Sequence, residues 1–222
     1  MDFQVIESKL KYTFKNKALI EQAFTHSSYG NEKHMPHNER MEFLGDSILG
    51  YVVTEYLFEN FPDKKEGELS TMKSNIVSAN GLRPVMEKLG LTEHLCIVDD
   101  KVTVDDSKKI PANLFEAILA AIYLDGGLLC AKEFVLNQLA EQLQNANSKK
   151  FKDDKSLLNE HFPQPKFNVK YEVVEKSGPD HNPTYKCAVI INGKQVAVGT
   201  GTNIKAAEQQ AAHKIVKEWR ID

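Results

Sequence analysis

The chain has 222 residues, which is enough for one large domain or two modest domains with a hydrophobic core each. Its formal net charge of −3 at pH 7 argues against an obvious nucleic-acid-binding protein when taken over the whole chain. The charge is uneven, however: residues 154–222 carry 10 Lys and Arg against 8 Asp and Glu, or +2, which leaves 18 against 23, or −5, for residues 1–153. An acidic front part suits metal chemistry, and a mildly basic rear part suits contact with a polyanion.

Cysteine usage and the N-terminal residues indicate a reducing compartment. The cysteines are widely spaced, include no Cys-x-x-Cys pair and are expected to be free thiols: Cys96, Cys130 and Cys187. The first residues include no basic stretch leading into an apolar segment, and the most apolar later region, residues 114–131, is interrupted by Glu116 and Asp125. We therefore expect a cytoplasmic protein that is neither secreted nor embedded in a membrane.

Apolar residues at helical spacing dominate the chain up to about residue 145 and predict an all-helical front domain. Helices are expected over residues 2–10, 15–23, 38–59, 67–78, 80–89, 112–125 and 128–145. The polar residues 62–65 and 98–109 are expected to form exposed loops.

Three carboxylates recur at helical spacing within the expected helix 38–59. Glu39, Glu42 and Asp46 stand at i, i+3 and i+7 and therefore share one side of the helix. Two partly buried carboxylates about 6 Å apart repel by about 3 kcal/mol, and a divalent cation between Glu42 and Asp46 would offset that repulsion. A solvated acidic face on an amphipathic helix is the other interpretation of the same spacing.

The pattern changes after residue 146. Residues 147–153 are polar and charged and are expected to form a short linker. Asn192 and Gly193 stand between β-forming residues, which predicts a tight hairpin turn. The rear part is expected to fold in the order αβββα, with a helix over 154–162, strands over 167–176, 184–192 and 195–200, and a helix over 203–218.

Motifs along the front part resemble, in the same order, those of the ribonuclease III family. They are THSS (25–28), NERMEFLGDS (38–47), EGELS (66–70), ANLFEAI (112–118) and AIYLD (121–125). The rear part resembles the double-stranded-RNA-binding domain through LNE (158–160), GPDH (178–181), GTG (199–201) and KAAEQQAA (205–212). The resemblance implies an all-α nuclease domain over 1–146, a linker over 147–153 and a small α+β binding domain over 154–222.

The resemblance also implies an activity. A family member would be a Mg²⁺-dependent endonuclease, with Mn²⁺ able to substitute, that hydrolyses double-stranded RNA and leaves 5′-phosphate and 3′-hydroxyl ends. Asp46 and Glu116 would be its catalytic residues, while Glu39 and Glu66 would assist a second ion or position the RNA. Its metal ligands are expected to be Glu42, Asp46, Asn113 and Glu116. Structured precursors such as ribosomal RNA are the implied substrates.

Asn113 departs from the family pattern, because it stands where the family normally has a metal-binding Asp. An amide oxygen can still ligate Mg²⁺ but contributes no charge. Asn113 and Glu116, at i and i+3, can converge on one ion; a helix-capping Asn beside an unrelated surface Glu is the other interpretation. The departure leaves an alternative function open, that of a catalytically impaired double-stranded-RNA-binding protein on the nuclease fold.

In the rear domain the resemblance identifies residues that would contact RNA. Asn159 and Glu160 on the first helix and His181 in the first hairpin loop would touch the minor groove, and Lys205 would face phosphate. An exposed helix face and an ordinary turn residue are the plainer interpretations of the first three. Ile204 stands where the family usually has a basic residue, so one phosphate contact is expected to be missing.

The family's solution to cutting both strands is a homodimer, in which two sites face the two strands of one duplex. Phe43, within the longest motif, is a candidate dimer-contact residue, and a buried core Phe is the alternative. A dimer would also double the RNA-binding domains and so raise the effective affinity for RNA.

Overall fold

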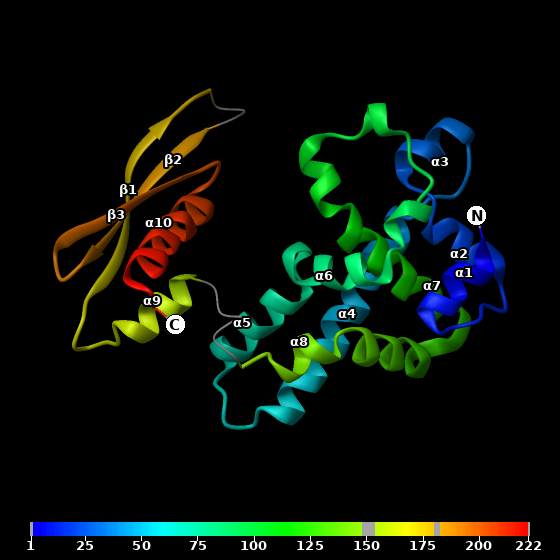
Figure 1. Ribbon diagram of the computed structural model, residues 1–222, viewed down its shortest axis with the longest axis horizontal. Helices are drawn as coiled ribbons and strands as arrows, with labels where there is room; N and C mark the ends of the chain where they lie inside the picture. Colours follow the sequence, from blue (N-terminus) through cyan, green and yellow to red (C-terminus); the bar gives the residue numbers. More distant parts are fainter. Residues whose placement is uncertain (1, 148–153, 180–182, 222) are drawn as a thin grey trace. The chain divides into compact units, whose positions relative to one another are not determined.

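The computed structural model describes residues 2–147, 154–179 and 183–221. The chain divides into two compact units, Met1–Asn147 and Ser148–Asp222, and each is described by itself (Figure 1). The first unit is helical, and the second combines a three-stranded sheet with two helices. The predicted fold class, an all-α domain followed by a small α+β domain, is therefore confirmed.

The first unit follows the predicted helices closely, with additions. Its helices are α1 (Phe3–Leu10), α2 (Lys17–Ala23), α3 (Ser27–Lys33), α4 (Glu39–Asn60), α5 (Glu66–Val77), α6 (Ala79–Leu89), η1 (Thr92–His94), η2 (Asp99–Lys101), α7 (Val104–Gln138) and α8 (Ala140–Gln144). The sequence pattern does not predict α3, because this segment is polar, buries only Gly30 and therefore carries no apolar period. Its start is fixed by His26, whose Nδ1 accepts a hydrogen bond from the backbone N–H of Ser28 at 3.2 Å.

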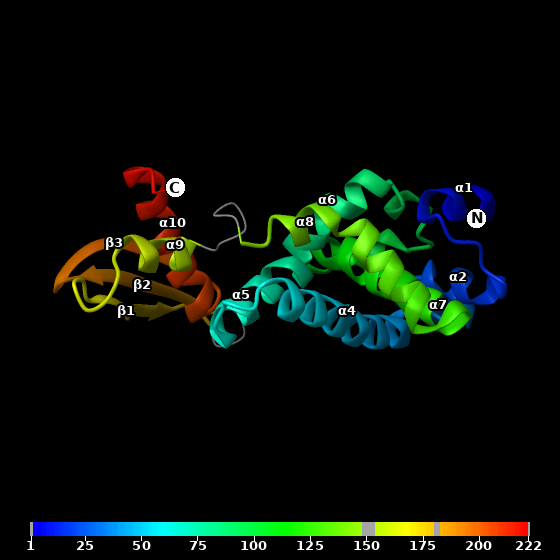
Figure 2. The same cartoon turned by 90° about the horizontal axis from the view of Figure 1, so that it is seen from below.

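The pair α4 and α7 forms the centre of the first unit, and the two helices lie side by side in Figures 1 and 2. Leu49, Val52 and Val53 of α4 are fully buried in its apolar core. Gly45 is the point of closest approach, because a Cβ atom at this position would lie 1.9 Å from the backbone oxygen of Glu116. Only a residue without a side chain lets α4 meet α7 here, and the acidic residues lie on either side of this contact.

The start of α7 differs from the prediction. The helix begins at Val104, so residues 104–109, which were expected to be loop, are helical. A loop was expected because the stretch is polar, but the N–H of Ser107 already donates to the carbonyl of Thr103 at 3.0 Å, and Pro111 lies inside the helix.

A break in α7 was predicted between residues 125 and 128, and it is present as a kink. Gly127 has φ 81° and ψ −178°, a conformation open mainly to glycine. Just before the kink, Asp125 accepts hydrogen bonds from the backbone N–H groups of Lys15 and Asn16 and from the hydroxyl of Tyr12, at 2.8 to 3.0 Å. This carboxylate therefore ties α7 to the connection between α1 and α2.

One helical segment among the described residues, Ser107–Gln138 of α7, is long and apolar enough to cross a membrane by length and composition alone. Half of its most apolar stretch is buried within the first unit, where α7 packs against α2, α4 and α6. Burial in the centre of a helical domain accounts for this apolar character.

The second unit has the predicted order of elements. These are α9 (Asp154–His161), β1 (Val169–Ser177), β2 (Thr184–Ile191), β3 (Lys194–Gly201) and α10 (Ile204–Trp219). The strands form one antiparallel sheet in the order β1-β2-β3, and α10 packs against it (Figures 1 and 2). Asn192 and Gly193 form the two-residue turn between β2 and β3 with φ 50° and 81°, which confirms the predicted hairpin.

Close packing of α10 on the sheet depends on small residues. A Cβ atom at Gly199 of β3 would lie 2.2 Å from the backbone N of Ala211 on α10. Leu158 of α9, Val189 of β2 and Ile215 of α10 are buried together in the core of this unit. The exposed surfaces of α9 and of the start of α10 are thereby held on a rigid scaffold.

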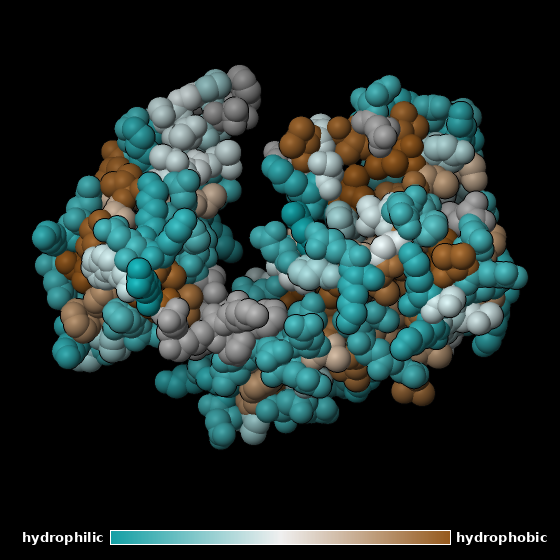
Figure 3. Space-filling view, viewed as in Figure 1, coloured by the Kyte–Doolittle hydropathy of each residue, from teal (hydrophilic) through white to brown (hydrophobic). Residues whose placement is uncertain are grey.

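The surface of the molecule is mainly hydrophilic on the face shown in Figure 3, with apolar residues gathered in smaller patches. Large apolar side chains that are exposed in the first unit include Phe43, which is 80% exposed, and Leu129, which is 83% exposed. The alternative that Phe43 is a core residue is therefore wrong. All three cysteines are free thiols, as expected.

Candidate active site

All four predicted metal ligands lie on α4 and α7, the two helices that are in contact at Gly45. Glu42 and Asp46 lie on α4, one turn apart, and Asn113 and Glu116 lie on α7. Glu42, Asn113 and Glu116 are half-buried, and Asp46 is exposed to solvent. The close contact of Gly45 with the backbone of Glu116 sets these side chains beside one another.

The electrostatics of this cluster are those of carboxylates that repel each other in a partly dry environment. Burial and the charge of Glu39 raise the pKa of Glu42 to about 7, against a hydrogen bond with the Asn113 amide that lowers it. Burial, followed by the charges of Asp46 and Glu42, raises the pKa of Glu116 to about 8. The four predicted ligands are therefore linked pairwise, Glu42 to Asn113 and Glu116 to Glu42 and Asp46. The N-cap interpretation of Asn113 is wrong, because Asn113 lies well inside α7.

The chemistry of this donor set fits a hard cation. Glu42, Asp46 and Glu116 offer carboxylate oxygens and Asn113 offers an amide oxygen, which are the ligands that Mg²⁺ and Mn²⁺ accept. Among the residues that the structure describes, no group of three His, Cys, Asp or Glu side chains is already arranged to hold a metal ion. Burial and, after it, the repulsion between carboxylates raise the two pKa values, and a bound cation would offset both.

The two assisting acids lie differently. Glu39 is exposed at the first position of α4, where it interacts electrostatically with Glu42 and lies 3.9 Å from Nδ1 of His37. Glu66 is exposed at the first position of α5 and accepts a hydrogen bond from the hydroxyl of Ser70 at 2.7 Å. Glu39 thus adjoins the cluster, whereas no contact described for Glu66 joins it to the other acids.

Beside the acids lies a cavity of about 330 Å³ that sequence reasoning did not identify. Glu39, Glu42 and Asn113 form one part of its wall. The remainder comes from α3, η2 and the first turns of α7, and includes His26, Ser27, Asn31, Lys101 and Lys109. The i, i+4 spacing of Lys109 and Asn113 could have indicated that both residues line this cavity, but residues 98–109 were predicted to be a loop and not a helix.

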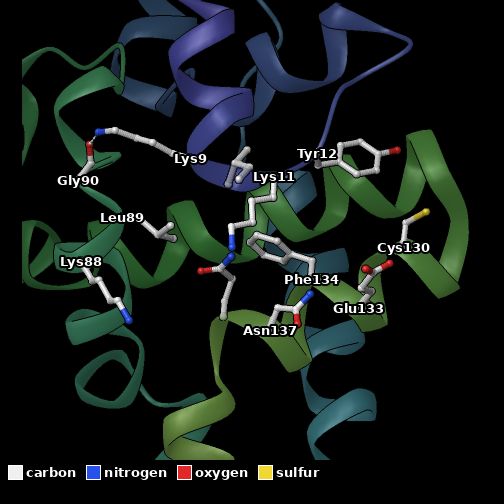
Figure 4. Close-up of a pocket in the computed structure, with 12 residues that line it drawn as sticks. Lys9, Lys11, Tyr12, Lys88, Leu89, Gly90, Cys130, Glu133, Phe134 and Asn137 are labelled. Atoms are coloured by element: carbon white, nitrogen blue, oxygen red, sulfur yellow. Dashed lines mark hydrogen bonds between the residues drawn. The ribbon is translucent and has the colours of Figure 1, made fainter.

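A larger cavity, of about 680 Å³, lies elsewhere in the first unit between α1, α6 and α7 (Figure 4). Its lining includes Lys9, Tyr12 and Phe134, and none of the predicted site residues. Lys9 donates a hydrogen bond from Nζ to the carbonyl of Gly90, the C-cap residue of α6, at 2.8 Å. This lysine therefore caps the C-terminal end of α6. The acidic site and this cavity are separate features.

In the second unit, three of the four predicted RNA-contacting residues lie at the surface. Asn159 and Glu160 are exposed on α9 next to the buried Leu158. Lys205 is exposed in the first turn of α10, which Asn203 caps by accepting a hydrogen bond from the N–H of Ala206 at 2.8 Å. His181 lies outside the described residues.

Two family models match the chain over most of its length. Residues 16–143 match the model described as "Ribonuclease-III-like", and residues 155–218 match the model described as "Double-stranded RNA binding motif". Together with the helical fold and its acidic site, these matches define the class of the protein, an endoribonuclease that carries a double-stranded-RNA-binding domain.

Sequence and structure similarity to known proteins identifies the family within this class. The chain is 39% identical over 220 residues to "Ribonuclease 3" of Clostridium botulinum (strain Eklund 17B / Type B), which covers 97% of this chain and 95% of that protein. It is 38% identical over 223 residues to "Ribonuclease 3" of Leptospira interrogans (strain Fiocruz L1-130), across 98% and 90% of the two chains. The structure of the nuclease domain of ribonuclease III from Campylobacter jejuni has a TM-score of 0.57 and 32% identity, and covers 64% of this chain and 98% of that one.

The chain therefore belongs to the ribonuclease III family. It is an enzyme, an endonuclease of double-stranded RNA, and its second domain binds that RNA.

Proposed function

We propose that this chain hydrolyses phosphodiester bonds in double-stranded RNA with Mg²⁺ held between α4 and α7, and that it leaves 5′-phosphate and 3′-hydroxyl ends. The observation that carries the proposal is the cluster of Glu42, Asp46, Asn113 and Glu116, in which two carboxyl groups have strongly raised pKa values. A bound Mg²⁺, or Mn²⁺ in its place, would lower the pKa of a water molecule and offset charge on the scissile phosphate.

The residues of the chain have distinct parts in this proposal. Asp46 and Glu116 stand closest to the chemistry, and Glu42 and Asn113 complete the set of oxygen ligands. In the absence of a cation, burial and the charges of Asp46 and Glu42 raise the pKa of Glu116 to about 8, and a bound cation would displace its proton. Glu39 and Glu66 are proposed to assist a second ion or to position the RNA.

The second domain is proposed to bind duplex RNA by its shape. Asn159, Glu160 and His181 would contact the minor groove, and Lys205 would contact phosphate. Ile204 is exposed beside Lys205 and contributes no charge, so we expect modest affinity for RNA from a single copy of this domain.

The chain is proposed to act as a homodimer. Phe43 and Leu44 of α4 and Leu124 of α7 line a cavity of about 550 Å³, and Phe43 itself is exposed, which supports an apolar contact between two copies. For the nuclease domain of the Campylobacter jejuni ribonuclease III, structural flexibility is described in a region involved in dimer formation. Two sites in one dimer would cut the two strands of a duplex.

Structured precursors, ribosomal RNA among them, are the proposed substrates, and the cytoplasm is the proposed compartment. The alternative of a binding protein without turnover receives no support from the relatives, since the two from Clostridium botulinum and Leptospira interrogans are named as ribonuclease 3. The retained carboxylates also argue against it, because a pure binding protein gains nothing from negative charge near phosphate.

The proposal is tested by incubating a long, end-labelled RNA duplex with the chain across a Mg²⁺ titration. We expect duplex-specific cutting that requires Mg²⁺, leaves a 5′-phosphate and a 3′-hydroxyl at each cut and is lost in Glu116→Gln. Single-stranded RNA of the same sequence is the control and should remain intact. Equal cutting without a divalent cation, or equal cutting by Glu116→Gln, would overturn the proposed mechanism.

A further inference from the structure

The cavity of about 330 Å³ beside the acids has two walls of opposite character. Glu39, Glu42 and Asn113 line the wall that belongs to the cation site. Lys101 of η2 and Lys109 of α7 bring positive charge to the same cavity. A polyanion whose scissile phosphate is at the acids must place neighbouring parts of its backbone beside these lysines.

Lys109 is aligned with the cation site along α7. Lys109, Asn113 and Glu116 stand at i, i+4 and i+7 and therefore share one side of the helix. One helical turn, about 5.4 Å along the axis, separates Lys109 from Asn113. The side chain of Lys109 is exposed, so its ammonium group can reach a ligand without disturbing the core.

Lys101 is held in a different way. Its Nζ donates to a carboxylate oxygen of Glu32 on α3 at 2.9 Å, and the ion pair fastens η2 to α3 at the edge of the cavity. Ser27 and Asn31 stand at i and i+4 on α3 and line the cavity as well. Because the Nζ of Lys101 is engaged in this ion pair with Glu32, which also pairs with Lys33, Lys109 is the stronger candidate for contact with an anion.

We infer that Lys109 binds a backbone phosphate next to the scissile one and so positions the strand that is cut. This inference rests on the proposed function and extends it to a residue outside the acidic cluster. The ammonium group neutralises one phosphate charge in the enzyme–RNA complex, in the cavity that Ser27 and Asn31 also line. Lys109 is thus a phosphate-binding residue, and the acids retain the chemistry.

A competing explanation is that Lys109 only balances the negative charge of the acids. The two roles differ in what they control. A lysine that balances the acids opposes the binding of Mg²⁺, so its removal would lower the Mg²⁺ concentration needed for half-maximal activity. A lysine that binds phosphate contributes to the binding of RNA, so its removal raises KM and weakens the salt dependence of binding.

The experiment compares Lys109→Met with Lys109→Arg and with Lys108→Met as the matched control. Lys108 is exposed next to Lys109 and does not line the cavity, and Lys108→Met removes the same charge as Lys109→Met. For Lys109→Met we expect KM for a short duplex to rise about fivefold, the slope of log affinity against log salt to fall by about one per protomer, and kcat to change little. Lys109→Arg should keep most of the affinity, and Lys108→Met should behave as the unaltered chain.

The inference is overturned if Lys109→Met keeps the KM and salt slope of the unaltered chain, or if Lys108→Met loses as much affinity as Lys109→Met. A lower Mg²⁺ requirement in Lys109→Met with unchanged KM would assign the lysine to charge balance instead. Thermal unfolding of each variant checks that the fold is retained. If the unaltered chain itself fails to cut duplex RNA, the proposed function fails, and that result is distinct from a failure of Lys109 alone.

Discussion

At the residue scale, Glu116 shows how burial and like charges prepare a carboxyl group for a cation. Its pKa rises from 4.5 to about 8 through burial and the charges of Asp46 and Glu42. The folded chain therefore binds a proton at Glu116 more tightly than the unfolded chain does. The contribution of Glu116 to the free energy of unfolding therefore falls as the pH rises from 4.5 to about 8.

Glu116→Gln should consequently stabilise the protein in the absence of divalent cations. At pH 8 we expect a gain of about 1–2 kcal/mol in the free energy of unfolding, a value reduced for solvent screening of a half-buried group. The gain should shrink as the pH falls toward 4.5 and vanish below it, where Glu116 is protonated in both the folded and the unfolded chain. Urea unfolding at pH 5 and pH 8 in EDTA measures it, and a variant that is less stable than the unaltered chain at pH 8 would contradict the account.

At the element scale, the contact between α4 and α7 is decided by Gly45. A Cβ atom there would lie 1.9 Å from the carbonyl oxygen of Glu116, so Gly45→Ala must push the two helices apart. We expect a loss of about 2–3 kcal/mol in the free energy of unfolding and a large loss of cleavage, because the acids on the two helices separate.

Gly50→Ala is the matched control on the same helix. The nearest atoms to a Cβ at Gly50 are Nζ and Cε of Lys73, at 3.4 and 3.5 Å, and both belong to a flexible side chain. Alanine should be tolerated there and should stabilise the helix by about 0.5–1 kcal/mol. Equal stability of the two alanine variants by thermal unfolding would show that the helices do not depend on contact at Gly45.

The sequence predicted the segments with a clear apolar period and missed the polar ones. The i, i+3, i+7 spacing of Glu39, Glu42 and Asp46 identified their shared side of α4 because 22 residues give a clear helical period. The seven-residue α2 was predicted too, because its apolar residues recur at helical spacing, whereas α3, also of seven residues, is polar. The early start of α7 lies in the polar stretch 98–109 that was expected to be a loop, and the position of Lys109 beside Asn113 was missed with it.

The pairing of α4 with α7 could not be derived from spacing. The sequence shows that Glu42 and Glu116 each lie on a helix, but which helices meet depends on the close contact at Gly45. Family resemblance supplied the pairing, and the raised pKa values of Glu42 and Glu116 show that the two acids are close enough to interact.

At the scale of the whole molecule, the exposed apolar residues of the nuclease domain bear on assembly. Phe43 is 80% exposed and lines a cavity with Leu44 and Leu124. If this surface joins two copies, Phe43→Ser should shift the chain from dimer to monomer by sedimentation velocity without lowering its melting temperature much, because little of this side chain is buried within one copy. Phe58→Ser, an exposed phenylalanine on the same helix that does not line the cavity, is the control and should stay dimeric.

The dimer prediction also links the two domains. Two copies would present two RNA-binding domains to one duplex, and tethering would raise their joint affinity above that of either alone. A monomeric Phe43→Ser variant should therefore bind a long duplex more weakly than the dimer does, although it retains Lys205 and the other predicted contacts. Unchanged binding by a proven monomer would contradict this link.

We propose that α4 and α7 together hold the cation required for RNA cleavage, with Asn113 as one of its ligands. The most direct test is duplex cleavage by the unaltered chain and by Asn113→Asp across a Mg²⁺ titration, with Asn137→Asp as a control that adds the same charge to α7 within the lining of the separate cavity. We predict that the unaltered chain cuts and that Asn113→Asp lowers the half-saturating Mg²⁺ concentration by roughly fivefold, since a fourth carboxylate strengthens the site. An identical Mg²⁺ dependence in all three proteins would remove Asn113 from the cation site and contradict the account.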